Sequence, residues 1–263
     1  MRRFSLILTG IVLVIACLRL PLLDAPMERD EGEYATMGLG MLRGTPPYQE
    51  TYTMKWPGTA AMYALIFKCL GPTTRALHAA LLIINGLAVI LVALTGRRLL
   101  GARAGLFAGA AYGTLTLGLG LYGPWLSAEH FAVMFLLSGI WVLPSSPEDK
   151  HAGWRLGLGC LLLGLAPVLK QHAAFPAGAW LLAAMHMIFN NPVSPRSKRW
   201  LCMAVMSTGF ILPAVVTCAL MKLCGVFSTF WFWTVIYASQ YASAVPLSTG
   251  WEYFKIGAGQ AAA

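Results

Sequence analysis

Long apolar runs separated by short polar breaks dominate this chain. A helix of roughly 20 apolar residues is long enough to cross the hydrocarbon core of a bilayer. Seven runs approach or exceed that length, at residues 4–23, 76–96, 104–122, 126–144, 155–170, 173–189 and 200–224. The pattern therefore predicts an all-α polytopic membrane protein with about seven transmembrane helices.

The first and second of these runs are separated by a polar loop, residues 24–57, and by a shorter apolar stretch at 58–70. The shorter stretch falls below the length needed to cross a bilayer, so we expect it to form an interfacial helix. Within the loop, a helix over 30–42 would bring side chains spaced three and four residues apart onto one face. Those side chains are Asp30, Glu33, Tyr34 and Met37.

Two further patterns indicate packing. Gly101, Gly105, Gly109 and Gly113 recur every four residues, which predicts a helix face that a neighbouring backbone approaches closely. Residues 118–123 match the letters of a GxGxxG nucleotide-binding motif, but they end an apolar helix and follow no strand, so we reject that interpretation.

The composition agrees with a membrane protein. Hydrophobic residues make up 58% of the chain, charged residues only 11%, and the mean hydropathy is +0.67. A soluble domain would carry about 25% charged residues. The six cysteines lie in apolar segments without CxxC spacing, so the sequence indicates neither a disulfide framework nor a zinc site.

The charges predict an orientation. The net charge is +9, and the basic residues cluster in the breaks between apolar runs, which suits the positive-inside rule better than nucleic-acid binding. Alternating spans place these clusters and the N-terminus in the cytoplasm, and 8 of the 10 acidic residues outside. We therefore expect a multi-pass protein of the inner (plasma) membrane whose chemistry is external. Arg19, near the outer end of the first run, is expected to snorkel to the interface.

Ionisable residues also mark the outer ends of two later runs. Glu129 opens the run at 126–144 and Lys170 closes the run at 155–170. Such groups are costly in lipid and usually face a polar cavity, although a purely structural Glu129–Lys170 pair fits the same pattern. Lys55, beside Trp56, is likewise open to an interfacial, snorkelling interpretation.

Two motifs of the external loop resemble a known family. Arg29-Asp30-Glu31-Gly32-Glu33-Tyr34 is similar to the Asp-Glu-x-x-Tyr element of GT-C integral-membrane glycosyltransferases, which include protein O-mannosyltransferases and aminoarabinose transferases. The stretch from Leu42-Arg43-Gly44 to Lys55-Trp56-Pro57 resembles the Gly-to-Lys-Pro-Pro segment that follows in that family. The likeness in the order of spans covers most of the chain.

The resemblance implies an activity and a set of site residues. Members move a sugar from a polyprenyl-phosphate donor to an acceptor lipid, glycan or protein at the outer membrane face. By similarity, Asp30 and Glu31 form the catalytic pair, with Asp30 as general base, and Lys55 binds the donor phosphate. Tyr34 joins Lys55 in the substrate-binding set, and we add Glu129 and Lys170 to it because they lie at the outer ends of their apolar runs. No metal ligand is assigned, and dependence on a divalent metal stays open.

The resemblance also implies that residues 1–263 form a single GT-C-like transmembrane domain that corresponds to the amino-terminal part of longer relatives. Two alternatives remain. A transporter would carry ionisable residues near the middle of its spans and broken helices in paired repeats. A non-catalytic scaffold subunit with a membrane-protein partner would keep the fold without a complete outer cavity.

Overall fold

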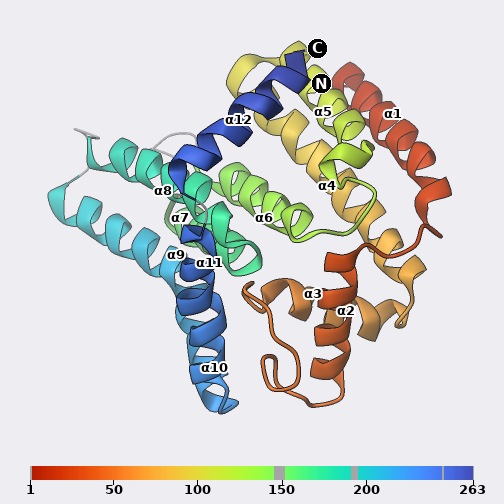
Figure 1. The fold of residues 1–263 in the computed structure, drawn as a ribbon. Helices are drawn as coiled ribbons and strands as arrows, with labels where there is room; N and C mark the ends of the chain where they lie inside the picture. The colour runs from red at the N-terminus through yellow and green to blue at the C-terminus, as the bar shows by residue number, and fades with distance from the viewer. Residues whose placement is uncertain (1, 145–151, 191–194, 245, 263) are drawn as a thin grey trace.

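The computed structural model describes residues 2–144, 152–190, 195–244 and 246–262. These residues form helices joined by loops, and no strand occurs among them (Figure 1). The all-α prediction is therefore confirmed for the described part of the chain.

Four helices of the described chain are long and apolar enough to cross a membrane, judged by length and composition. They coincide with four of the seven predicted runs. They are α1 (Arg2–Arg19) with the 3-10 turn Leu20–Leu22, α4 (Thr74–Leu100), α8 (Ala174–Phe189) with the turn Gln171–Ala173, and α9 (Arg196–Leu223). These helices are compatible with a membrane protein.

The other three runs form shorter helices, so the count of seven spans is not confirmed. They are α5 (Ala102–Leu115), α6 (Ala128–Val142) and α7 (Ala152–Leu169), with 14, 15 and 18 residues. At about 1.5 Å rise per residue, a helix of 14 or 15 residues falls short of the roughly 30 Å hydrocarbon core. In the run at 104–122, a turn at Thr116 and the glycines after it end the helix early.

The polar loop at residues 24–57, which we call the external loop after its predicted position, contains one predicted helix and leads into another. α2 spans Arg29–Leu42, which confirms the expected helix over 30–42, and α3 spans Gly58–Leu70. α3 packs against α2, α4 and α7, and Tyr63 and Phe67 on it are buried. The interfacial position of α3 in a bilayer stays a prediction.

Close helix contacts at glycine hold the bundle together. A Cβ atom on Gly105 would lie 2.3 Å from the Ala93 carbonyl oxygen, and one on Gly109 would lie 2.9 Å from the Ala93 Cβ. α5 therefore packs directly on α4, as the glycine spacing predicted. The same device joins α7 to α9, where Gly164 faces the backbone of Phe210.

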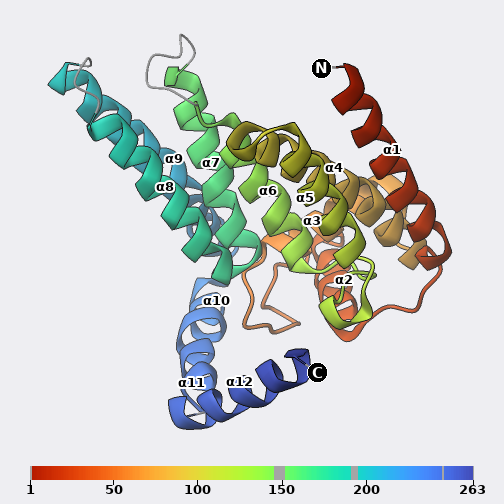
Figure 2. The same ribbon diagram turned by 90° about the horizontal axis from the view of Figure 1, so that it is seen from above.

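The segment after Gly225 contains helices that the sequence pattern did not predict. α10 (Phe227–Trp231), a π-helical turn (Phe232–Tyr237), α11 (Ala238–Ser243) and α12 (Leu247–Ala262) follow one another. Phe230 on α10 is buried against Tyr48 and Trp56 of the external loop. Trp233 of the π-helical turn stacks on Tyr52 of the same loop, with ring centroids 4.7 Å apart. Figure 2 shows α12 lying apart from the bundle, so α10 and the π-helical turn are the parts that support the loop.

Candidate functional site

The first turn of α2 is fixed by a capping box, in which side chains satisfy the free backbone N–H groups of the helix start. The Glu28 carboxylate accepts a hydrogen bond from the Asp30 N–H at 2.6 Å, and the Glu28 N–H donates to Glu31 Oε2 at 3.3 Å. Such boxes occur where a Glu follows the cap by three residues. The backbone of Asp30 is thereby fixed at the start of α2.

Lys55 lies against the polar face of α2. Its Nζ is 2.8 Å from Asp30 Oδ2 and 3.3 Å from Glu33 Oε2. The same ammonium lies 4.7 Å from the centroid of the Tyr34 ring, within cation–π range. Asp30, Glu33 and Tyr34 thus share one face as predicted, and the chain brings Lys55 onto it from 22 residues beyond Glu33.

Contacts to several helices hold the segment around Lys55. The Tyr48 hydroxyl donates to the Lys55 carbonyl at 2.8 Å, and the Lys55 N–H donates to Thr53 Oγ1 at 3.1 Å. The Gln171 side chain, at the start of α8, donates to the Met54 carbonyl at 2.7 Å. Tyr48 has a left-handed backbone, with φ of 65°, and is buried. The position of Lys55 therefore depends on α8 and α10 as well as on its own loop.

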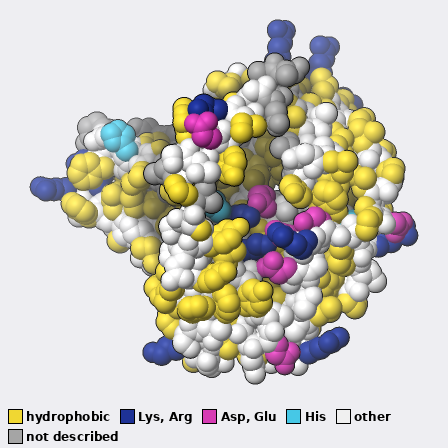
Figure 3. Space-filling view, in the orientation of Figure 1, with side chains coloured by type: hydrophobic (Ala, Val, Ile, Leu, Met, Phe, Trp, Pro, Cys, Tyr) yellow, Lys and Arg dark blue, Asp and Glu magenta, His cyan; other side chains and the backbone are white. Residues whose placement is uncertain are grey.

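A second ion pair lies beside the first. Lys170 Nζ, at the junction of α7 and α8, is 2.8 Å from Glu129 Oε1 in the first turn of α6. The charge of Lys170 also acts on Asp30. Figure 3 shows Lys, Arg, Asp and Glu side chains gathered near the middle of this face, where α2 and α6 approach each other in Figure 1. Asp30, Tyr34, Lys55, Glu129 and Lys170 are thus brought together.

The local environment acts on the acidity of Asp30 and Tyr34. Burial alone would raise the pKa of the Asp30 carboxyl, but the hydrogen bond and charge of Lys55, helped by Arg29 and Lys170, outweigh it and lower that pKa. Burial and the nearby carboxylates raise the pKa of the Tyr34 phenol far above its ordinary value. Asp30 is therefore an anion and Tyr34 a neutral hydroxyl at neutral pH.

Glu31 has a different environment from Asp30. Its side chain is only 1% exposed; Oε1 accepts a hydrogen bond from the Leu126 N–H at 2.6 Å, and the carboxylate lies 3.3 Å from His78 Nε2. These contacts link α2 to α4 and to the segment before α6. Glu31 is thus placed where it fixes the geometry of the site, while Asp30 meets Lys55.

Sequence reasoning missed His78, which is the buried partner of Glu31. His78 Nδ1 is 3.1 Å from the Leu23 carbonyl oxygen, which can only accept, so Nδ1 carries a proton. His78 Nε2 lies 3.3 Å from Glu31 Oε2, and both side chains are buried. The contact between Glu31 and His78 therefore connects the start of α2 to α4 inside the protein.

Contrary to the prediction from the sequence pattern, Arg19 does not snorkel to the interface. It is 3% exposed, and it donates to the Gly123 carbonyl at 3.0 Å and to the Thr116 carbonyl at 2.5 Å. The snorkelling prediction was wrong because the loop after α5 folds over the end of α1 and offers carbonyl acceptors there. Only the tertiary fold reveals those acceptors.

A cleft of about 280 Å³ opens beside Asp30 and Glu129. Tyr122, Trp125 and Ser127 from the loop before α6 form its other wall. The Trp125 indole N–H donates to the Pro26 carbonyl at 3.1 Å, which ties this loop to the start of the external loop. The cleft can therefore take a polar group against the Asp30 carboxylate, flanked by aromatic rings.

Among the described residues, no three His, Cys, Asp or Glu side chains lie close enough together to hold a metal ion. Comparison with family models, with curated proteins and with solved structures gave no significant match to this chain.

Proposed function

We propose that this chain is a glycosyltransferase of the GT-C type, which moves a sugar from a polyprenyl-phosphate donor to an acceptor at the outer face of the membrane. The proposal rests on the two loop motifs and on one structural observation. Lys55, which the second motif supplies, contacts Asp30, Glu33 and Tyr34, which the first motif supplies.

The roles follow from the charges. A phosphate that approached Lys55 would compete with Asp30 and Glu33 for the ammonium. Once Lys55 turns toward the phosphate, it no longer lowers the pKa of Asp30 as strongly. Burial then raises that pKa, so the carboxylate becomes a stronger base. Asp30 then accepts the proton of the acceptor hydroxyl, whose oxygen bonds to the anomeric carbon as the bond from that carbon to the phosphate oxygen breaks. The carrier phosphate keeps the electron pair of that bond, and attack opposite to it inverts the anomeric carbon.

The other residues support this step. Lys170, paired with Glu129, adds positive charge near the phosphate, and Tyr34 offers a hydroxyl that stays protonated. The buried contact between Glu31 and His78 holds α2 against α4. The site lies in the segments that the positive-inside rule places outside, so the substrates are expected on the periplasmic or exterior side.

One observation favours a second candidate function, the non-catalytic scaffold. Asp30 and Lys55 already pair at 2.8 Å, as they would in a purely structural contact. The two functions differ in what removal of Lys55 does to substrate handling. An enzyme loses donor binding, whereas a scaffold has no donor binding to lose.

Lys55→Met tests the proposal in vesicles loaded with a polyprenyl-phosphate sugar, with transfer to an acceptor added outside. Lys55 contacts phosphate in the ground state and in the transition state, so the variant should raise the donor KM about tenfold or more and change kcat less. The matched control is Lys68→Met, which removes an exposed lysine of α3 and should transfer normally. Wild-type protein that binds no donor would support the scaffold, and a Lys55→Met donor KM equal to that of wild type would remove Lys55 from the site.

A further inference from the structure

We propose that a pocket between the ends of α4, α6 and α8 binds one anionic phospholipid of the membrane, with its phosphate at Arg98 and an acyl chain in the pocket. The site is separate from the Asp30–Lys55 cluster. The proposal goes beyond the proposed glycosyl transfer and does not depend on it.

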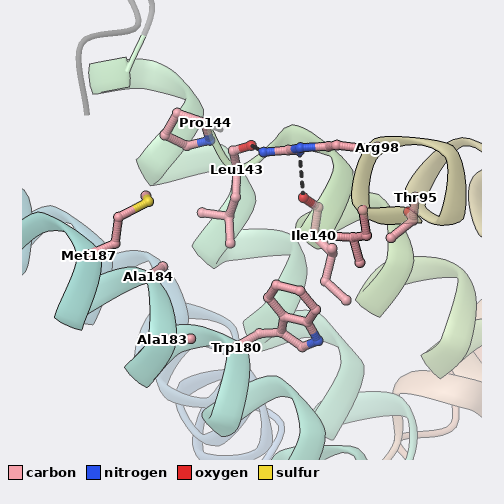
Figure 4. Close-up of a pocket in the computed structure, with 10 residues that line it drawn as sticks. Thr95, Arg98, Ile140, Leu143, Pro144, Trp180, Ala183, Ala184 and Met187 are labelled. Atoms are coloured by element: carbon pink, nitrogen blue, oxygen red, sulfur yellow. Dashed lines mark hydrogen bonds between the residues drawn. The ribbon is translucent and has the colours of Figure 1, made fainter. Parts of the chain in front are cut away.

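The pocket has a volume of about 360 Å³ and mainly apolar walls. Ile140 of α6 and Leu143, which follows α6, face Trp180, Ala184 and Met187 of α8 across it (Figure 4). Apolar cavities do not hold water well, because water needs two to four polar partners. A hydrocarbon chain is therefore the occupant that suits these walls.

Arg98 brings a positive charge to the pocket. Its guanidinium donates to the Leu143 carbonyl at 3.0 Å and makes a longer contact of 3.4 Å to the Ile140 carbonyl (Figure 4). It also donates to the Trp141 carbonyl at 3.2 Å. A guanidinium has five N–H donors, so these bonds leave donors for another acceptor. Within the described part of the chain, no carboxylate lies within 4.0 Å of the Arg98 guanidinium. Arg98 is exposed at the surface.

Thr95 adds a hydroxyl group to the pocket lining, one helical turn before Arg98. Its Oγ1 is buried and has no hydrogen-bond partner among the described residues. Thr95 and Arg98 both line the pocket, and residues three apart on a helix share a face. The pocket thus offers a cation, a hydroxyl donor and apolar walls. A phosphate, an ester carbonyl and an acyl chain are the complementary groups, and a phospholipid carries all three.

Charge complementarity selects an anionic lipid. Arg97 on α4 and Arg155 on α7 lie near the same helix ends, and the Arg155 Nε donates to the Val142 carbonyl at 2.8 Å. Guanidinium groups bind phosphate oxygens through paired, charge-assisted hydrogen bonds. A zwitterionic headgroup adds its own positive charge beside these arginines and is therefore disfavoured.

Native mass spectrometry of the full chain, delipidated in mild detergent, tests the site. Phosphatidylglycerol and phosphatidylcholine with identical acyl chains are titrated, and the Kd of the first bound lipid is measured. We expect one phosphatidylglycerol to bind at least about tenfold more tightly than phosphatidylcholine. Arg98→Gln should weaken the binding of phosphatidylglycerol by about that factor, since a charge-assisted hydrogen bond to its phosphate is lost. It should weaken phosphatidylcholine less, because the choline cation already offsets the attraction between its phosphate and the arginines. Ala183→Phe, which fills the pocket from its exposed side, should weaken both lipids.

Two control variants match these changes. Arg103→Gln removes an exposed charge from the same end of the bundle, and Ala179→Phe adds a ring to an exposed position of α8 outside the pocket walls. Both should bind lipid like wild type, and circular dichroism should show all four variants folded. Equal binding of the two lipids, equal losses in Arg98→Gln and Arg103→Gln, or displacement of the lipid by millimolar inorganic phosphate would overturn the proposal. Loss of lipid binding through misfolding of Ala183→Phe leaves Arg98→Gln to decide.

Discussion

At the scale of single residues, the charge of Asp30 is controlled by Lys55. Burial of Asp30 is the largest single influence on its pKa and acts to raise it, yet the lysine reverses the result. The carboxylate is thus a weak base while Lys55 is bound to it. Anything that draws Lys55 away, such as a phosphate, strengthens Asp30 as a base.

This balance predicts a pH-dependent stability difference between wild type and Lys55→Met. In wild type, the lowered pKa of Asp30 contributes stability above about pH 4, and the contribution is lost as the pH falls through that lowered pKa. Without Lys55, burial raises the Asp30 pKa, so the charged form destabilises the variant at neutral pH. The gap in thermal unfolding temperature should be widest near pH 7 and shrink below about pH 4. An equal gap at both pH values would contradict this account.

Sequence could identify the residues whose partners are set by local motifs, and it missed those with tertiary partners. Asp30, Glu33 and Tyr34 follow from helical spacing, and Glu129 and Lys170 follow from their position at the ends of apolar runs. Arg19 donates to backbone carbonyls of a distant segment, and His78 contacts the Leu23 carbonyl and the Glu31 carboxylate. No pattern in a single sequence specifies which carbonyls will be near.

At the scale of elements, the start of α3 packs against the end of α7 and so connects α7 to the site. A Cβ atom on Gly58 would lie 2.5 Å from the Val168 carbonyl oxygen of α7. Thr59 next to it donates to the Leu169 carbonyl at 2.9 Å. Gly58 follows Lys55 by three residues and Leu169 precedes Lys170, so these contacts connect the segment that carries Lys55 to the segment that carries Lys170.

Gly58→Ala should therefore impair both stability and donor binding. The new methyl group forces α3 away from α7, at a cost of about 1–3 kcal/mol typical of overpacking. Gly32→Ala on α2 is the matched control, since no atom lies within 4 Å of its Cβ, and helix propensity should make it slightly stabilising. Thermal unfolding and donor KM are measured for both. If Gly58→Ala behaves like Gly32→Ala, then α3 does not couple the two ion pairs.

At the scale of the whole molecule, helix content was predictable and helix length was not. The apolar runs gave the positions of α1, α4, α8 and α9, because composition alone marks such helices. The shorter α5, α6 and α7 end at glycine, proline and loop contacts whose effect depends on the fold. Two of the shorter helices carry the polar site: Glu129 lies in the first turn of α6, and Lys170 directly follows α7.

The central claim is that Asp30 is the base of a sugar transfer in which Lys55 holds the donor. Turnover of a polyprenyl-phosphate sugar by purified Asp30→Asn protein tests it most directly, because asparagine keeps the shape of the carboxylate but does not accept a proton at neutral pH. Asp24→Asn serves as the control, since Asp24 is a surface acid of the same loop that pairs with Arg75. We predict a kcat about a hundred- to ten-thousand-fold below wild type for Asp30→Asn and an unchanged kcat for Asp24→Asn. An Asp30→Asn protein with wild-type turnover would contradict the account.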